Sequence, residues 1–169
     1  YTFTVTATNA AGTGSASSAS SSVTPSASIS TPGAPGIGTA VAYNETATVT
    51  WTAPASDGGS EITGYKVEYS SDNGSTWGNQ TLNTGTSFTT YTASSLINGT
   101  SYIFRVSAIN GQGTGSPSAQ SNSVTPLGPP GAPTGVSGVA GNAQVTVSWS
   151  APSDTGGATI TGYTVTSNP

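Results

Sequence analysis

The chain has 169 residues, of which two are Lys or Arg and six are Asp or Glu, giving a net charge of −4. Two cations cannot neutralise a run of phosphates, so neither nucleic acid nor an anionic membrane surface is expected as a partner. Cys, His and Met are absent, so no thiolate or imidazole is available for a metal site or a nucleophile, and no apolar run approaches the about 20 residues that span a bilayer.

Residues 1–25 begin with an alternating pattern, YTFTVTATNAAGTGS, and end with VTP. Alternation of this kind predicts half-buried β-strands, here two strands joined by a turn. The same wording returns as YIFRVSAINGQGTGS at 102–116 and VTP at 124–126, in each case 101 residues further along. The start of the chain therefore predicts the last two strands of a repeated domain, a slice of something longer, followed by a linker at 26–32.

The middle of the chain predicts a series of short strands with polar turns between them. In the second strand Val49 and Trp51 face inward between threonines, and in the third Tyr65 faces inward. The fifth strand is ambiguous because strict alternation cannot place Phe88 and Tyr91 on one face. The strands are predicted near 37–43, 46–53, 62–71, 77–83, 86–93, 101–110 and 117–125.

The sixth strand is preceded by an unusual corner. Leu96 stands six residues before Tyr102, and an Asn-Gly turn lies between them. A tyrosine in this position can bury its ring and bond its hydroxyl to the backbone upstream, which is the tyrosine corner of Greek-key sandwiches. The segment thus predicts a two-sheet sandwich.

Three landmarks of the middle domain return 98 residues later: the tripeptide GAP, the tryptophan pair Trp51 and Trp149, and the tetrapeptide ITGY. A repeat of this length is typical of one sandwich domain. Residues 33–126 are therefore predicted as a complete domain. After a linker at 127–130, residues 131–169 are predicted as the first three strands of a further domain.

These landmarks resemble the fibronectin type III family across essentially the whole chain. The resemblance implies an all-β fold, with fibronectin type III (immunoglobulin-like) β-sandwiches in tandem, one complete seven-stranded domain flanked by two partial ones. It is closest in style to tandem domains of large bacterial secreted or cell-surface proteins, and it implies a spacer, scaffold or adhesive module and no enzyme. The family's integrin-binding Arg-Gly-Asp loop has no counterpart. The structural residues that match are Trp51, Tyr65, Leu96, Tyr102, Trp149 and Tyr163.

The carboxylates offer little chemistry. Asp57 and Glu61 lie in one predicted loop and Asp72 in the turn at the far end of a strand, so they are not expected to converge on Ca²⁺ or on a substrate. Asp is also an ordinary turn residue. No catalytic, metal or cofactor site is predicted, and no cofactor is expected.

Two further groups lie on the predicted outer face. Lys66, Glu68 and Arg105 are expected there as an exposed cross-strand group of small energetic weight. Trp77 could offer a flat apolar face to a sugar, although an aromatic residue that caps the sandwich edge is the more ordinary interpretation.

The sequence therefore favours a noncatalytic segment of a long extracellular repeat protein, on a cell surface or in a filament. Its expected partners are other copies of itself or neighbouring domains, and carbohydrate is a lesser candidate. The alternative is a spacer or carbohydrate-binding module of a secreted polysaccharide-degrading enzyme. The partial ends raise another option, because core positions such as Phe3, Val5 and Trp149 would be exposed and could pair with another copy.

Overall fold

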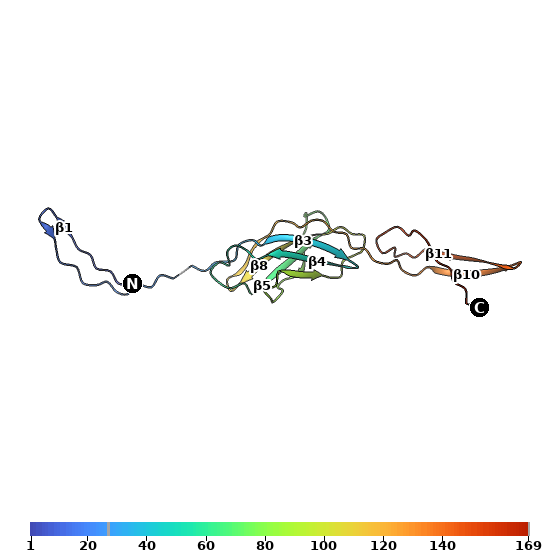
Figure 1. Cartoon of the computed structure of the whole chain (residues 1–169), viewed down its shortest axis with the longest axis horizontal. Helices are drawn as coiled ribbons and strands as arrows, with labels where there is room; N and C mark the ends of the chain where they lie inside the picture. The colour runs from blue at the N-terminus through green and yellow to red at the C-terminus, as the bar shows by residue number, and fades with distance from the viewer. Residues whose placement is uncertain (27, 169) are drawn as a thin grey trace.

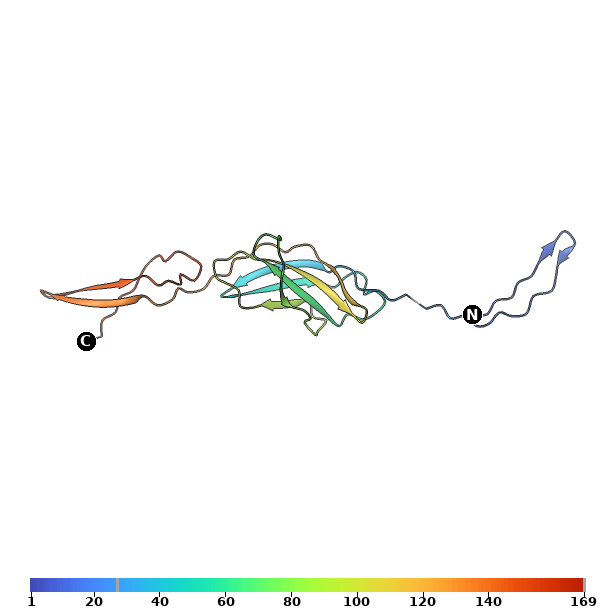
Figure 2. The same cartoon turned by 180° about the vertical axis from the view of Figure 1, so that it is seen from behind.

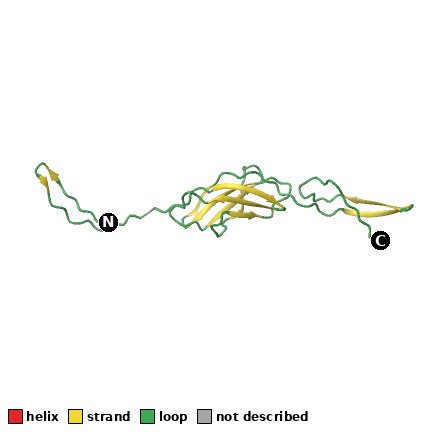
Figure 3. Ribbon diagram, in the orientation of Figure 1, coloured by secondary structure: helices red, strands yellow, loops and turns green. Residues whose placement is uncertain are grey.

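The computed structural model describes residues 1–26 and 28–168. Three parts follow one another along its long axis: a hairpin at the N-terminal end, a sandwich in the middle and a second hairpin (Figures 1 and 2). Residue 27, in the predicted linker, and residue 169, at the end of the predicted partial domain, lie outside the described residues. Strands and loops make up everything described, and no helix is present among these residues (Figure 3).

The central part is a sandwich of two antiparallel sheets, which confirms the predicted all-β fold. The three-stranded sheet has the order β3-β4-β7, and the four-stranded sheet has the order β6-β5-β8-β9. The bounds are β3 Gly36–Tyr43, β4 Thr46–Thr52, β5 Gly64–Ser70, β6 Gly78–Thr81, β7 Thr90–Ala93, β8 Ile103–Asn110 and β9 Gly113–Pro117.

Alternation of side chains along β4 and β5 forms the core between the sheets. Val49 and Trp51 on β4 and Tyr65 and Val67 on β5 are buried, whereas Thr48 and its neighbours on the other face of β4 are partly exposed. Burying alternate residues is what a half-covered sheet requires. The buried cluster consists of Ala40, Ala47, Val49, Trp51, Tyr65, Val67, Ala93, Leu96, Tyr102, Phe104, Val106 and Ala108.

The last strand of the sandwich differs from its prediction. β9 begins at Gly113, directly after a two-residue turn, and ends at Pro117. The strand had been predicted to begin near 117 and to continue to 125. Beyond it the chain still runs beside β8, because Ser118 and Ser121 donate backbone bonds to Val106 and Phe104. Their hydroxyls also accept bonds from the backbone N–H groups of the same two residues. Side-chain oxygens thus replace part of the backbone ladder and interrupt the regular strand.

The structure also settles the ambiguous fifth strand. β7 begins only at Thr90 and pairs with β4, and Tyr91 packs against the core. Phe88 lies before the strand and is 71% exposed. The pairing with β4 decides the register, because a strand edge must match its neighbour's hydrogen-bonding groups.

The N-terminal hairpin has only two short strands, β1 Thr8–Asn9 and β2 Gly12–Thr13. Backbone hydrogen bonds nevertheless join its two arms along their length. The first, next to the short strands, runs from Gly14 N to Ala7 O, and the last runs from Val23 N to Tyr1 O. Each of the outer bonds has a counterpart 101 residues later, in β8 or at the residue directly before it. The pairs are Ser17–Val5 with Ser118–Val106, Ser20–Phe3 with Ser121–Phe104, and Val23–Tyr1 with Val124–Tyr102.

The C-terminal hairpin consists of β10 Thr134–Gly141 and β11 Gln144–Ser150, which lie 98 residues after β3 and β4. A third strand was expected around Tyr163, but residues 151–168 contain none. In the sandwich the equivalent strand, β5, is bonded by β6 on one side and β8 on the other. Residues 131–168 include no comparable neighbour, so no ladder forms there.

Candidate functional site

At the corner before β8, Tyr102 connects the start of the strand to the loop that precedes it. Tyr102 is 5% exposed, and its hydroxyl oxygen accepts a bond from the backbone N–H of Ile97 at 3.1 Å. Leu96 is buried beside it and donates its backbone N–H to the carbonyl oxygen of Glu45. The tyrosine ring also meets the ring of Tyr69 edge-on, with centroids 5.8 Å apart. These contacts give the corner an architectural role.

The two tryptophan–tyrosine pairs have similar interplanar angles, 63° and 59°, but differ in burial. Trp51 and Tyr65 pack edge to face with centroids 5.0 Å apart, and both are buried. Trp149 and Tyr163 lie 5.3 Å apart in the C-terminal segment, where Tyr163 is 44% exposed. Edge-to-face aromatic packing stabilises a pair beyond the area that it buries. The second pair therefore reproduces a core contact without its covering sheet.

An apolar depression of about 220 Å³ lies beside the second pair. Its lining includes Val147 and Val165, which correspond at an offset of 98 to Val49 and Val67 in the sandwich core. Both residues of the core are fully buried, whereas Val165 is 56% exposed. The depression is thus lined by counterparts of core residues that no second sheet covers among the described residues.

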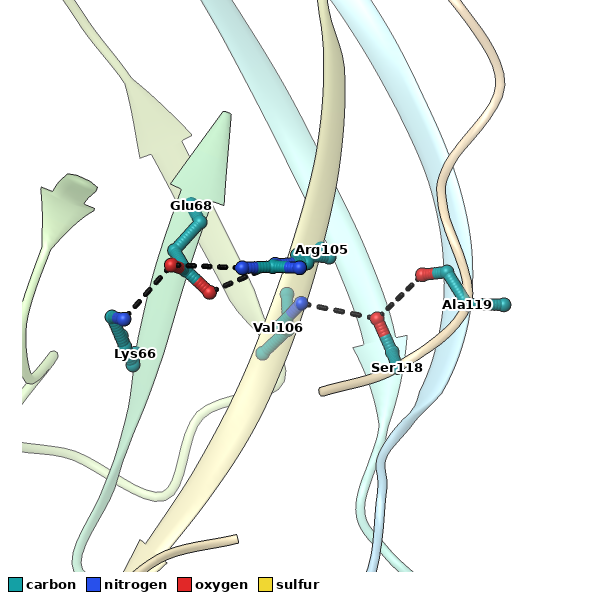
Figure 4. A network of polar contacts seen from close by, with 6 residues as sticks. All are labelled: Lys66, Glu68, Arg105, Val106, Ser118 and Ala119. Carbon is teal, nitrogen blue, oxygen red and sulfur yellow. Dashed lines mark hydrogen bonds and ion pairs between the residues drawn. The ribbon is translucent and has the colours of Figure 1, made fainter. Parts of the chain in front are cut away.

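A three-residue ion cluster occupies the outer face of β5 and β8 (Figure 4). The carboxylate of Glu68 accepts bonds from Lys66 Nζ at 2.8 Å, Arg105 Nε at 2.9 Å and Arg105 Nη2 at 3.2 Å. Glu68 is only 6% exposed, so the expectation of a fully exposed group was wrong for the carboxylate. Neighbouring long side chains cover it, although the strand face points outward.

The charge of Glu68 is stabilised by its partners. Burial raises the pKa of the carboxyl, but the hydrogen bonds and positive charges of Arg105 and Lys66 outweigh burial and hold the pKa below its ordinary value of 4.5. The group is therefore ionised at neutral pH. Its oxygens are used by partners within the protein, which fits a structural cluster better than a catalytic acid.

Trp77 borders this cluster. The guanidinium carbon of Arg105 lies 4.2 Å from the centroid of the indole ring, within the range of a cation–π contact, and the tryptophan is half-buried. One face of the ring is thus covered by a cation of the same protein. Contact between Trp77 and a sugar remains a prediction.

The loop carboxylates stay apart and close turns. Asp57 accepts the backbone N–H of Gly59 at 2.8 Å, and Glu61 is exposed. Asp72 accepts hydroxyl bonds from Ser70 and Thr76, each at 2.6 Å. These hydrogen bonds, from Ser70 and then Thr76, lower the pKa of Asp72 to about 2. Within residues 1–26 and 28–168, no group of three His, Cys, Asp or Glu side chains gathers to hold a metal.

Asn110 makes contacts that the sequence did not reveal. Its side-chain amide donates to the carbonyl oxygens of Ser30 at 2.8 Å and Asp57 at 2.7 Å, so it joins the linker to a loop of the sandwich. Its Oδ1 accepts the backbone N–H of Gln112. The recurrence of Asn at position 9, 101 residues earlier, was the available signal. Asn110 thus connects the linker, a loop of the sandwich and the turn after β8.

A family model for the fibronectin type III domain matches residues 33–124. A crystal structure of domains from titin is 36% identical, with a TM-score of 0.51, over 56% of this chain and 32% of the titin chain. The chicken CNTN1 FN1–FN3 domains are 27% identical, with a TM-score of 0.52, over 70% of this chain and 42% of theirs. This chain therefore spans less than half the length of either structure. None of the described residues forms a helix long and apolar enough to cross a membrane.

Proposed function

The chain belongs to the fibronectin type III family of structural and interaction modules, and from that premise we propose that it is a tandem-repeat segment of a long extracellular protein. Residues 33–126 act as one complete bead, with linkers at 26–32 and 127–130. Residues 1–25 supply the last two strands of a preceding domain, and residues 131–169 supply the first strands of a following one. The segment performs no catalysis.

The observation that carries this proposal is a difference in exposure between equivalent residues. Phe104 and Val106 are fully buried in the sandwich, whereas Phe3 and Val5, 101 residues earlier, are 59% and 73% exposed. The backbone around both pairs is bonded in the same way. An apolar side chain in a core-forming arrangement stabilises a fold only when another sheet covers it. The flanking hairpins therefore expose apolar side chains at positions that form the core of the complete sandwich, and further strands would cover them.

The surface composition supports an assembling role on a cell surface or in a filament. Charged residues number eight in 169, and the cross-strand face of β4 and β7 carries Thr48 opposite Thr92. Such faces repel one another weakly, so copies can lie side by side.

We assign the chain to a bacterial secreted or surface protein on the style of its repeats. Immunolabelling of intact source cells tests this location, and label confined to permeabilised cells would overturn it.

Sedimentation of the full chain over a range of concentrations tests whether the hairpins are half-sandwiches. We expect association that increases with concentration and weakens in the variants Val5→Ser and Val165→Ser. Phe88→Ser is the matched control, because Phe88 is similarly exposed but lies on the complete domain. A chain that stays monomeric throughout, or an equal effect of Phe88→Ser, would overturn the proposal.

Electron microscopy gives a second measure of the same proposal. Beads joined end to end or side by side are expected for the full chain under native conditions. Isolated beads that never associate would count against a filament role. The alternative is a spacer or carbohydrate-binding module of a secreted polysaccharide-degrading enzyme. A catalytic domain elsewhere in the full-length protein would decide for it, and glycan binding that Trp77→Ala abolishes would support it. One ring face of Trp77 already contacts Arg105, so no described contact favours that alternative over the structural role.

A further inference from the structure

The turn at Gly156–Gly157 contacts the end of the central sandwich that faces the C-terminal hairpin (Figure 1). Gly157 has φ of 82°, and a Cβ placed on it would lie 2.8 Å from Gly99 Cα and still closer to Gly99 N. A Cβ placed on Gly99 would in turn lie 3.0 Å from Gly157 Cα. The two glycines are 58 residues apart in the chain, and their backbones touch because neither carries a side chain. The contact joins two consecutive repeats.

The linker beside this contact is bonded to the same turn. Gly128 N donates to Gly156 O and Gly131 N donates to Asp154 O, both at 2.9 Å. Asp154 Oδ1 also accepts the N–H of Gly156 at 2.8 Å. The linker therefore follows the turn as an ordered segment, and its direction is set by backbone hydrogen bonds.

The surface that receives the turn is itself braced. Asn98, next to Gly99, donates its side-chain amide to Asn44 Oδ1 at 2.8 Å and accepts the N–H of Glu45 at 3.0 Å. A Cβ on Gly128 would meet both asparagine side chains. The turn at Asn44–Glu45 and the turn at Asn98–Gly99 are thus hydrogen-bonded to each other, and Gly99 is the residue that contacts Gly157.

The same turn occurs at the other end of the central sandwich, 98 residues earlier. Ser30 N donates to Gly58 O at 2.8 Å and Gly33 N donates to Ser56 O at 2.9 Å, which repeats the bonds of the second linker. Gly59 has φ of 79°, close to the value at its counterpart. Here, however, a Cβ would meet only the linker, with a side-chain carbon of Ile29 at 3.4 Å.

We propose that the Gly-Gly turn of each repeat is a docking surface for the Asn-Gly turn of the repeat before it, and that this contact sets the angle between neighbouring sandwiches. Gly156–Gly157 takes Asn98–Gly99 in this chain, and Gly58–Gly59 is the surface for the equivalent turn of a preceding repeat. The inference rests on the proposed tandem arrangement and adds the joint that holds it. Neighbouring sandwich domains then keep a fixed angle to one another.

Nuclear magnetic resonance of the full chain tests the joint through the amide signals of Asn98 and Gly99. We expect Gly157→Ala to shift these signals, because overpacking separates the two turns. Gly59→Ala is the matched control. It places the same side chain at nearly the same φ in the equivalent turn, so its local backbone strain is equal.

The two variants separate a joint from local strain. Signals of Asn98 and Gly99 that move with Gly157→Ala and not with Gly59→Ala support the joint. Unchanged signals in both variants, or equal changes in both, would overturn it. This readout is independent of self-association, so the joint can fail while the sedimentation results still support the proposed function.

A longer chain tests the surface at Gly58–Gly59. In this chain residues 33–130 are placed directly before residues 33–169, so the second copy of Gly59 follows a complete repeat. Gly59→Ala in that second copy should now shift the Asn98 and Gly99 signals of the first copy. If those signals do not move, Gly58–Gly59 is not a docking surface and the proposal fails for the preceding repeat.

Discussion

Tyr102→Phe removes one hydroxyl from the corner that braces β8 and leaves the ring in place. The hydroxyl oxygen accepts the N–H of Ile97 at 3.1 Å, an ordinary length for a neutral bond, and the tyrosine is 5% exposed. Water cannot readily replace the lost partner, so the cost lies between the net value of a hydrogen bond and that of an unsatisfied N–H, about 1–2 kcal/mol. For a domain of this size the melting temperature falls by about 4–16 °C.

Thermal and urea unfolding of the full chain, followed by circular dichroism, measure this change. The urea midpoint should fall with an unchanged slope, because the substitution leaves the surface exposed on unfolding nearly the same. Tyr1→Phe is the matched control, since Tyr1 occupies the equivalent position but is 75% exposed and should change stability by less than about 0.5 kcal/mol. A Tyr102→Phe variant as stable as the Tyr1→Phe control would refute the corner's role.

Three further predictions concern the core and the charged groups. Trp51→Ala should destabilise the sandwich by about 3–5 kcal/mol, whereas Trp149→Ala should leave its urea midpoint nearly unchanged, because only Trp51 lies in the complete core. Glu68→Gln should cost about 1–3 kcal/mol at pH 7 by weakening three charged hydrogen bonds, which urea unfolding measures, and wild-type stability would contradict it. The pKa of Asp72 is lowered from 3.8 to about 2, so its contribution is present above about pH 4 and is lost as pH falls towards 2. Melting curves between pH 2 and 7 should show a smaller acid-induced loss for Asp72→Asn, and identical curves would contradict this reasoning.

Several features of the fold followed from local patterns alone. The alternation in β4 placed Val49 and Trp51 inside, and the structure buries both. The Leu96–Tyr102 spacing predicted a corner that the structure forms through the hydroxyl of Tyr102. These features depend on neighbours within a few residues, so periodicity and turn chemistry are sufficient to predict them.

Other features depended on partners distant in the chain. The serines at 118 and 121 shorten β9 because their hydroxyls meet β8, and Arg105 and Lys66 cover Glu68 on a face that alternation assigns to solvent. Side-chain partners across a sheet have no fixed sequence spacing. Strand patterns alone therefore placed the residues on a face without giving their burial.

The sequence by itself determined the family of the fold and the period of the repeat, because strand alternation and the matching landmarks at offsets of 98 and 101 are properties of the linear chain. Only the tertiary structure decided which copy of each landmark is buried. Val67 and Val165 each stand two residues after the tyrosine of an ITGY tetrapeptide, yet one is covered by a second sheet and the other is 56% exposed. It also brought Gly99 against Gly157, since a contact between two turns requires both domain ends to be folded and the linker between them to be bonded in place.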